Sequence, residues 1–129
     1  MTTGQPKLFL RLEGLALFAA SLVAFVYLEQ SYWIFAALFL VPDLCLAFYF
    51  IGPRRGAVVY NICHSTIGPW LLAIYGVLAG ELFPQVLASI WLAHIGFDRA
   101  IGYGLKYPSD FRDTHLGRIG RSATERGAC

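Results

Sequence analysis

The chain has 129 residues, of which 57% are hydrophobic and 14% are charged, and its formal net charge is +2. Soluble domains are about 45–50% apolar and about 25% charged, and a chain this short could not hide so much apolar surface in one core. The composition excludes disorder, collagen, a disulfide scaffold and a polybasic nucleic-acid binder. It predicts a protein whose solvent is lipid.

Four apolar stretches are each long enough to cross a hydrocarbon core of about 30 Å as a helix. The connections between them are short and contain turn residues such as Gly52, Pro53 and Gly80, so neighbouring helices are expected to be antiparallel. We predict an all-α polytopic membrane protein, with a four-helix transmembrane domain over residues 1–105 and a basic tail over residues 106–129. The predicted spans are residues 8–28, 32–51, 57–78 and 83–105.

Basic residues lie on one side of this predicted topology. They precede the first span, occupy the second connection at Arg54 and Arg55, and recur in the tail, whereas the other two connections carry Glu29 and Glu81. The positive-inside rule then places both termini in the cytoplasm. A cleaved signal peptide is the alternative for the first span, but no small-x-small site follows Leu28, and we expect an uncleaved helix.

The cysteines form no recognisable motif. Cys45 and Cys63 lie singly within predicted spans, and Cys129 is the last residue. The sequence therefore shows no disulfide framework and no CxxC motif, and we interpret Cys45 and Cys63 as small core residues.

Polar residues inside the spans are the exceptions to the hydropathy pattern. A charged side chain costs about 2.5–3.5 kcal/mol at a helix centre, so such residues are candidates for a functional site. They lie roughly 6–16 Å from the cytoplasmic ends of the spans, and their helical phase, with small residues on the same faces, favours convergence on a polar pocket open to the cytoplasm. The residues are Glu13, Asp43, Asn61, His64, His94, Asp98 and Arg99.

Several of these residues also have structural explanations. Asp98 and Arg99 are expected either to form an ion pair or to snorkel toward the cytoplasmic interface, and Asn61 suits an interhelical hydrogen bond. Trp70 and Trp91 lie deep enough to form either pocket walls or simple core. Two histidines and three carboxylates at one level nevertheless favour a site over a purely structural network.

The first functional hypothesis is an intramembrane enzyme that uses general acid–base catalysis, without a cofactor, on a lipophilic, isoprenoid-like substrate. A carboxyl group in a low-dielectric site can stay protonated and donate a proton, as isomerisation, epoxide opening or terpene cyclisation requires. Asp43, which follows Pro42 in mid-span, would be the acid. The other catalytic candidates are His64 and His94 as proton acceptors, with Glu13 and Asp98 tuning them. The substrate-binding candidates are Asn61, Trp70, Trp91 and Tyr49, whose aromatic rings could stabilise a carbocation.

Two other functions stay open. His64 and His94 could hold haem or a divalent metal, and the carboxylates favour a hard metal site made of Glu13, Asp43 and these two histidines. No Glu-x-x-His pair is present, so a di-iron site lacks its usual signature. A proton-coupled transport or assembly subunit is the third hypothesis. We expect membrane lipid as a partner, no nucleic acid, and allow for a homo-oligomer.

The string HIGFDRAIGYGLKYPSDFRDTHLGRIG, from His94 to Gly120, resembles the signature of a family of small four-helix bacterial integral-membrane proteins catalogued as a domain of unknown function. The resemblance extends from about Leu12 to Arg121, and implies a four-helix fold in the bacterial inner membrane and no settled activity. It also draws attention to the tail, which could fold back and cap the pocket or lie solvated beside anionic headgroups. The tail residues concerned are Tyr103, Lys106, Tyr107, Thr114, His115 and Gly117.

Overall fold

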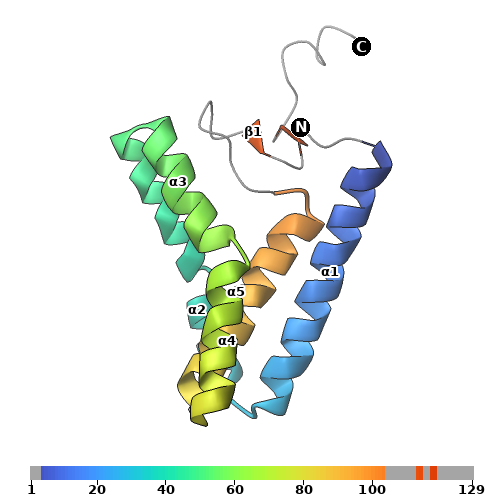
Figure 1. The fold of residues 1–129 in the computed structure, drawn as a ribbon, viewed down its shortest axis with the longest axis vertical. Helices are drawn as coiled ribbons and strands as arrows, with labels where there is room; N and C mark the ends of the chain where they lie inside the picture. Colours follow the sequence, from blue (N-terminus) through green and yellow to red (C-terminus); the bar gives the residue numbers. More distant parts are fainter. Residues whose placement is uncertain (1–3, 104–112, 115–116, 119–129) are drawn as a thin grey trace, which may run out of the picture.

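A computed structural model describes residues 4–103, 113–114 and 117–118, without the side chains of residues 46, 48, 49, 113–114 and 117–118. The fold is helical (Figure 1). Its elements are α1 (Gly4–Tyr27), α2 (Tyr32–Phe39), the 3₁₀ helix η1 (Val41–Ile51), α3 (Pro53–His64), α4 (Ile67–Ala79), α5 (Leu82–Ala100), and the two-residue strands β1 (Asp113–Thr114) and β2 (Gly117–Arg118). The strands pair antiparallel, with Asp113 opposite Arg118. The rest of the predicted capping tail, His115 included, lies outside the described residues.

The predicted first and fourth spans each form one helix, α1 and α5. Within the described part of the chain, two helical stretches are long and apolar enough to cross a membrane, Gly4–Tyr27 and Pro53–Ala79. Large apolar side chains also cover the outside, and those of Trp33, Phe50 and Leu78 are among the most exposed.

The predicted second span is not one continuous α-helix. The α-helix α2 ends at Phe39, and the chain continues as η1 from Val41. Pro42 explains the break, because its ring lacks an N–H and would clash with the carbonyl of Leu38 in a continuing α-helix. The break sets the position of Asp43. Its backbone N–H donates to the carbonyl of Leu40, three residues earlier (3.0 Å), whereas a continuing α-helix would bond it to the residue four earlier.

The predicted third span is broken in the same way. The helix α3 ends at His64, Ser65 is extended, and α4 begins at Ile67. Pro69 lies four residues after Ser65, so an unbroken helix would place the proline ring against the Ser65 carbonyl. His64 therefore lies at the C-terminal end of a helix in the middle of the predicted span.

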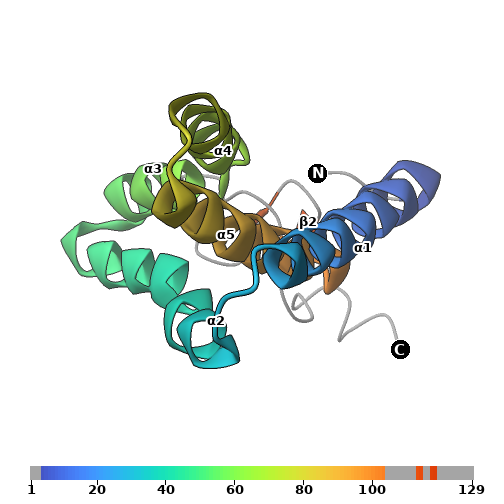
Figure 2. The same cartoon turned by 90° about the horizontal axis from the view of Figure 1, so that it is seen from below.

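The helix α5 is the centre of the packing, since it contacts α1, α2 and α4, while α3 pairs with η1. Figures 1 and 2 show α1 and α5 side by side and antiparallel, with the α3–η1 hairpin leaning away from α1. Gly14 and Gly96 let α1 and α5 approach closely, because a Cβ on Gly96 would lie 2.6 Å from the Phe18 nitrogen. Arg11 adds a bond across this pair, donating from Nε to the Ala100 carbonyl at the end of α5 (2.9 Å).

The interpretation of Cys45 and Cys63 as small core residues is wrong. Cys45 in η1 and Cys63 in α3 form a disulfide across 18 residues of sequence, with their Cα atoms 6.9 Å apart. The turn at Gly52 and Pro53 folds η1 back along α3 and brings the two thiols together. A tertiary hairpin of this kind leaves no spacing motif in the sequence. Cys129 lies outside the described residues.

Candidate metal centre

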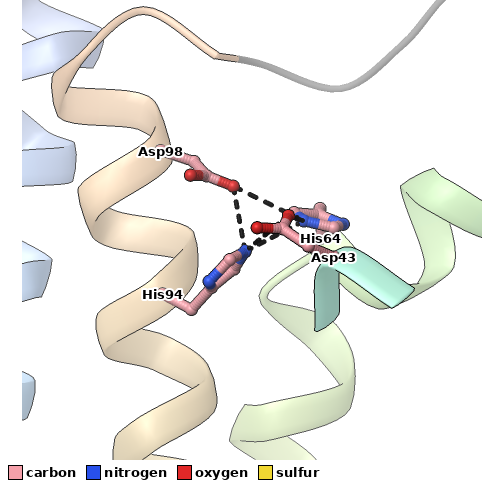
Figure 3. A group of neighbouring side chains, drawn as sticks. All are labelled: Asp43, His64, His94 and Asp98. Atoms are coloured by element: carbon pink, nitrogen blue, oxygen red, sulfur yellow. Dashed lines mark hydrogen bonds and ion pairs between the residues drawn. The ribbon is translucent and has the colours of Figure 1, made fainter. Parts of the chain in front are cut away.

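Four polar side chains from three elements meet at one point (Figure 3). Asp43 comes from the first turn of η1, His64 from the last turn of α3, and His94 and Asp98 from α5. His94 and Asp98 share a face because they are four residues apart on one helix. The breaks at the two prolines bring the other two side chains to that face.

The donor atoms of this cluster are evenly spaced. The Nε2 atom of His64 lies 3.3 Å from Asp43 Oδ1 and 3.4 Å from Asp98 Oδ2. The Nε2 atom of His94 lies 3.2 Å and 3.1 Å from the same two oxygens, and 3.1 Å from His64 Nε2. All four donor atoms lie within 4.8 Å of one another.

Most of these distances are close to those between the ligands of a tetrahedral metal ion, and all four atoms lie within 4.8 Å of one another. Nitrogen and oxygen ligands at about 2.0–2.2 Å from a tetrahedral Zn²⁺ are about 3.3–3.6 Å apart. Five of the six distances in the cluster are between 3.1 and 3.4 Å. The four atoms therefore enclose a space with the dimensions of a first coordination shell.

The ring of His64 is held in the orientation that a metal ligand requires. Its Nδ1 donates to the Tyr60 carbonyl at 3.0 Å, and since a carbonyl only accepts, the proton of the neutral ring is on Nδ1. Nε2 then presents a lone pair to the cluster. Metal-binding histidines commonly donate their second ring nitrogen to a backbone carbonyl in this way.

The Tyr60 ring reinforces this orientation, because it stacks on the His64 ring with centroids 3.8 Å apart and planes 8° apart. Phe39 contacts His94 edge to face, at 5.3 Å between centroids. The Nδ1 of His94 is buried without a hydrogen-bond partner among the described residues. Both imidazoles are thus fixed by aromatic neighbours, with Nε2 pointing inward.

Acceptor atoms face one another in the cluster. With its ring proton on Nδ1, the neutral His64 presents Nε2 to the Asp43 and Asp98 oxygens and to His94 Nε2. Acceptor atoms this close repel one another unless a proton or a cation lies between them. Protons on the carboxyl groups or on His94 can fill this role, and a divalent cation would offset both carboxylate charges at once.

Access to the cluster is uneven. The side chains of His64, His94 and Asp98 are at most 11% exposed, whereas that of Asp43 is 39% exposed. The recess between His64, Asp98 and Tyr103 has no space for a water molecule. Among the described residues, the polar groups therefore contact one another directly and line no open space at this recess, and Asp43 is the most exposed of them.

Comparison with known proteins agrees with the helical fold. The model of a family described as a domain of unknown function (DUF4260) matches residues 7–119. The chain belongs to this family. No curated protein and no solved structure matches the chain.

Two charged residues of this DUF4260 chain lie apart from the cluster. Glu13 on α1 acts electrostatically on Arg99, and neither of them is part of the group formed by the four donor residues. The expected pair of Asp98 with Arg99 is wrong, because Asp98 points to the histidines. The metal set suggested by the sequence therefore changes, with Asp98 in the place of Glu13.

The predicted substrate-binding residues are scattered. Trp70 lines a cavity between α1, α4 and α5, Asn61 lies on α3 one turn before His64, and the side chain of Tyr49 lies outside the described part. Trp91, like Asn61, precedes a histidine of the cluster by three residues. It is one turn before His94, and its Nε1 donates to the carbonyl of Cys63.

Sequence reasoning missed Tyr60 as the residue that orients His64. Its position four residues before His64 on one helix is a signal that could have indicated it, since the i−4 carbonyl and ring both lie beside the imidazole. The disulfide beside the cluster left no comparable signal.

Proposed function

We propose that the protein is a four-span membrane protein whose function depends on a divalent metal ion held by Asp43, His64, His94 and Asp98. The observation that carries the proposal is the near-tetrahedral spacing of the four donor atoms, 3.1–3.4 Å for five of six pairs. Two neutral imidazoles and two carboxylates form a neutral site with such an ion. A neutral site is the form that a low-dielectric surrounding tolerates.

The proposed topology uses α1, α2 with η1, α3 with α4, and α5 as the four spans, with both termini in the cytoplasm of a bacterial inner membrane. The start of α1 and the turn between η1 and α3 lie at the same end in Figure 1, and the turns after α1 and before α5 lie at the other. Arg54 and Arg55 mark the first end, and Glu29 and Glu81 mark the second. This charge distribution follows the positive-inside rule.

The ligand set favours a small ion over haem. Axial ligands on opposite sides of a haem iron would be about 4 Å apart with a flat ring between them, as twice a metal–nitrogen bond of about 2.0 Å requires. The two Nε2 atoms are 3.1 Å apart, with both carboxylates beside them. Nitrogen and oxygen ligands in tetrahedral arrangement suit Zn²⁺.

An ion held by all four residues in tetrahedral geometry would have no open position for a substrate or a water. Asp43 is the most exposed ligand, so Lewis-acid chemistry would require this carboxylate to leave the ion, or a fifth ligand to join it, as a substrate approaches. We propose an enzyme that acts on a lipophilic substrate within the cytoplasmic half of the membrane.

Metal analysis of the purified protein tests the proposal. We expect about one tightly bound Zn²⁺ per chain by elemental analysis, with the same site accepting Co²⁺. Asp98→Asn should lose the ion, because the amide cannot balance its charge. Glu13→Gln is the matched control, since it removes a carboxylate of α1 that is not part of the cluster. A wild-type protein that binds neither ion, or an Asp98→Asn protein that binds them unchanged, would show that the proposal is wrong.

A second candidate is the cofactor-free acid–base enzyme, as an isomerase or terpene or epoxide cyclase. The contact of the half-exposed Asp43 carboxyl with both imidazoles favours it, because such a group can pass a proton to a substrate and regain it from histidine. Turnover that persists in a protein stripped by chelator would support this candidate over the metal enzyme.

A further inference from the structure

An apolar cavity of about 260 Å³ lies beside the candidate metal centre. Its walls come from α2, η1, α3 and α5, and all of the lining residues are apolar. They are Leu38, Val41, Pro42, Cys45, Cys63, Leu87, Ile90 and Trp91, with the two cysteines joined as the disulfide.

Some residues of the cavity wall lie directly before, or one turn before, a candidate metal ligand on the same element. Pro42 directly precedes Asp43, Cys63 directly precedes His64, and Trp91 is one turn before His94. Each element that supplies a ligand thus supplies a wall residue next to it. The Trp91 indole is also fixed against α3 by its bond to the Cys63 carbonyl.

We propose that this cavity binds a single hydrocarbon chain of an amphiphilic substrate, whose polar group reaches the metal past Asp43. The inference rests on the proposed metal centre and names its substrate class. An all-apolar lining recognises only a chain that needs no hydrogen bond. The volume is just below the range of about 300–1,000 Å³ that is typical for pockets of drug-sized ligands, so it suits one chain and excludes a whole two-chain lipid.

Contact quenching of Trp91 tests the inference in the full chain. Trp33→Phe and Trp70→Phe leave Trp91 as the single indole of the described residues, and neither of the two replaced residues lines this cavity. The metal-loaded protein in phosphatidylcholine nanodiscs is titrated with a fatty acid brominated in mid-chain. A second titration uses a two-chain phosphatidylcholine with bromine at the same positions, because bulk lipid is the other source of hydrocarbon chains.

We expect saturable quenching by the single-chain acid and shallow, unsaturable quenching by the two-chain lipid. Leu87→Phe fills the cavity and should raise the half-saturating concentration about tenfold. Leu17→Phe is the matched control. Leu17 is also a half-buried leucine, but it lines the cavity between α1, α4 and α5. Leu87→Ala enlarges the cavity and should keep saturable quenching. This second variant keeps the inference testable if the Leu87→Phe protein does not fold.

The outcomes separate the two proposals because metal content is measured in the same samples. Equal, unsaturable quenching by both lipids in a protein that holds its metal overturns the chain-binding inference and leaves the metal centre standing. Identical titrations of the Leu87→Phe and Leu17→Phe proteins overturn it as well. A protein without metal overturns the proposed function, whatever the quenching.

Discussion

The Nε2 atoms of His64 and His94 face each other at 3.1 Å, although the residues are 30 positions apart and belong to different helices. The ring proton of His64 is on Nδ1, which donates to the Tyr60 carbonyl, so Nε2 offers a lone pair to the cluster. The arrangement suits a cation between the two rings. Protons bind the same nitrogen lone pairs, so they should compete with the metal ion at low pH.

The affinity for Zn²⁺ or Co²⁺ is expected to fall as the pH falls. Both imidazoles must be neutral to bind, so metal binding releases protons wherever the metal-free imidazoles are protonated. The logarithm of the apparent association constant should drop by up to about two per pH unit in this acidic range. Titration with Co²⁺ followed by visible absorption, from about pH 5 to pH 8, measures it. An affinity that is constant over this range would contradict histidine ligation.

The Tyr60 ring is expected to determine how well His64 binds. Tyr60→Phe keeps an aromatic ring in the stack with His64, so the metal affinity should stay close to that of the wild type. Tyr60→Ala removes the ring and should weaken metal binding about 10–100-fold, as is usual for residues that orient a ligand. The visible spectrum of bound Co²⁺ should change too, because it reports ligand geometry. Equal affinity in both variants would mean that the α3 backbone alone orients the imidazole.

Part of this site could be predicted from the sequence, for identifiable physical reasons. His94 and Asp98 are four residues apart in an uninterrupted helix, so their common face follows from helix geometry. Depth along a span placed Glu13 in the same layer, but depth does not determine which way a helix is rotated. Gly14 packs closely against Arg99 at the end of α5, and Glu13, the residue before it, acts electrostatically on Arg99 and is not part of the cluster.

The fold shows the same limit. The sequence predicted one helix at residues 8–28 and one at residues 83–105, and the structure has Gly4–Tyr27 and Leu82–Ala100 there. Of the two, α1 is long and apolar enough to cross a membrane, whereas α5 is not among the described stretches that meet this criterion. Hydropathy could not predict the breaks of the second and third spans, since Pro42 and Pro69 are as apolar as their neighbours and the effect of proline is on backbone bonding. Those breaks position Asp43 and His64, so the missed local structure is the part that builds the site.

The Cys45–Cys63 disulfide is expected to stabilise the η1–α3 hairpin and the metal centre together. Asp43 is two residues from Cys45, and His64 follows Cys63 directly. Replacing both cysteines with serine should lower the free energy of unfolding by about 2–4 kcal/mol, as is typical for closing a loop of this length, and should weaken metal binding. Denaturant unfolding and metal titration measure the two effects. Alkylation of both thiols without prior reduction would show that the bond is absent.

The close approach of α1 and α5 at Gly96 gives a prediction that does not depend on the metal. A Cβ on Gly96 would lie 2.6 Å from the Phe18 nitrogen and 2.7 Å from the Gly14 carbonyl oxygen. Both are backbone atoms, so a methyl group there can be accommodated only if the two helices move apart.

Gly96→Ala should therefore destabilise the protein by about 1–3 kcal/mol, despite the better helix propensity of alanine. Gly68→Ala is the informative comparison, because the nearest atoms to its new methyl group belong to the Trp91 ring, at 2.7 Å. A side chain can rotate away, so the loss should be smaller and should be accompanied by a change in indole fluorescence. Thermal unfolding of both variants in the same lipid measures the difference. A Gly96→Ala protein as stable as the wild type would mean that α1 and α5 are farther apart than the structure places them.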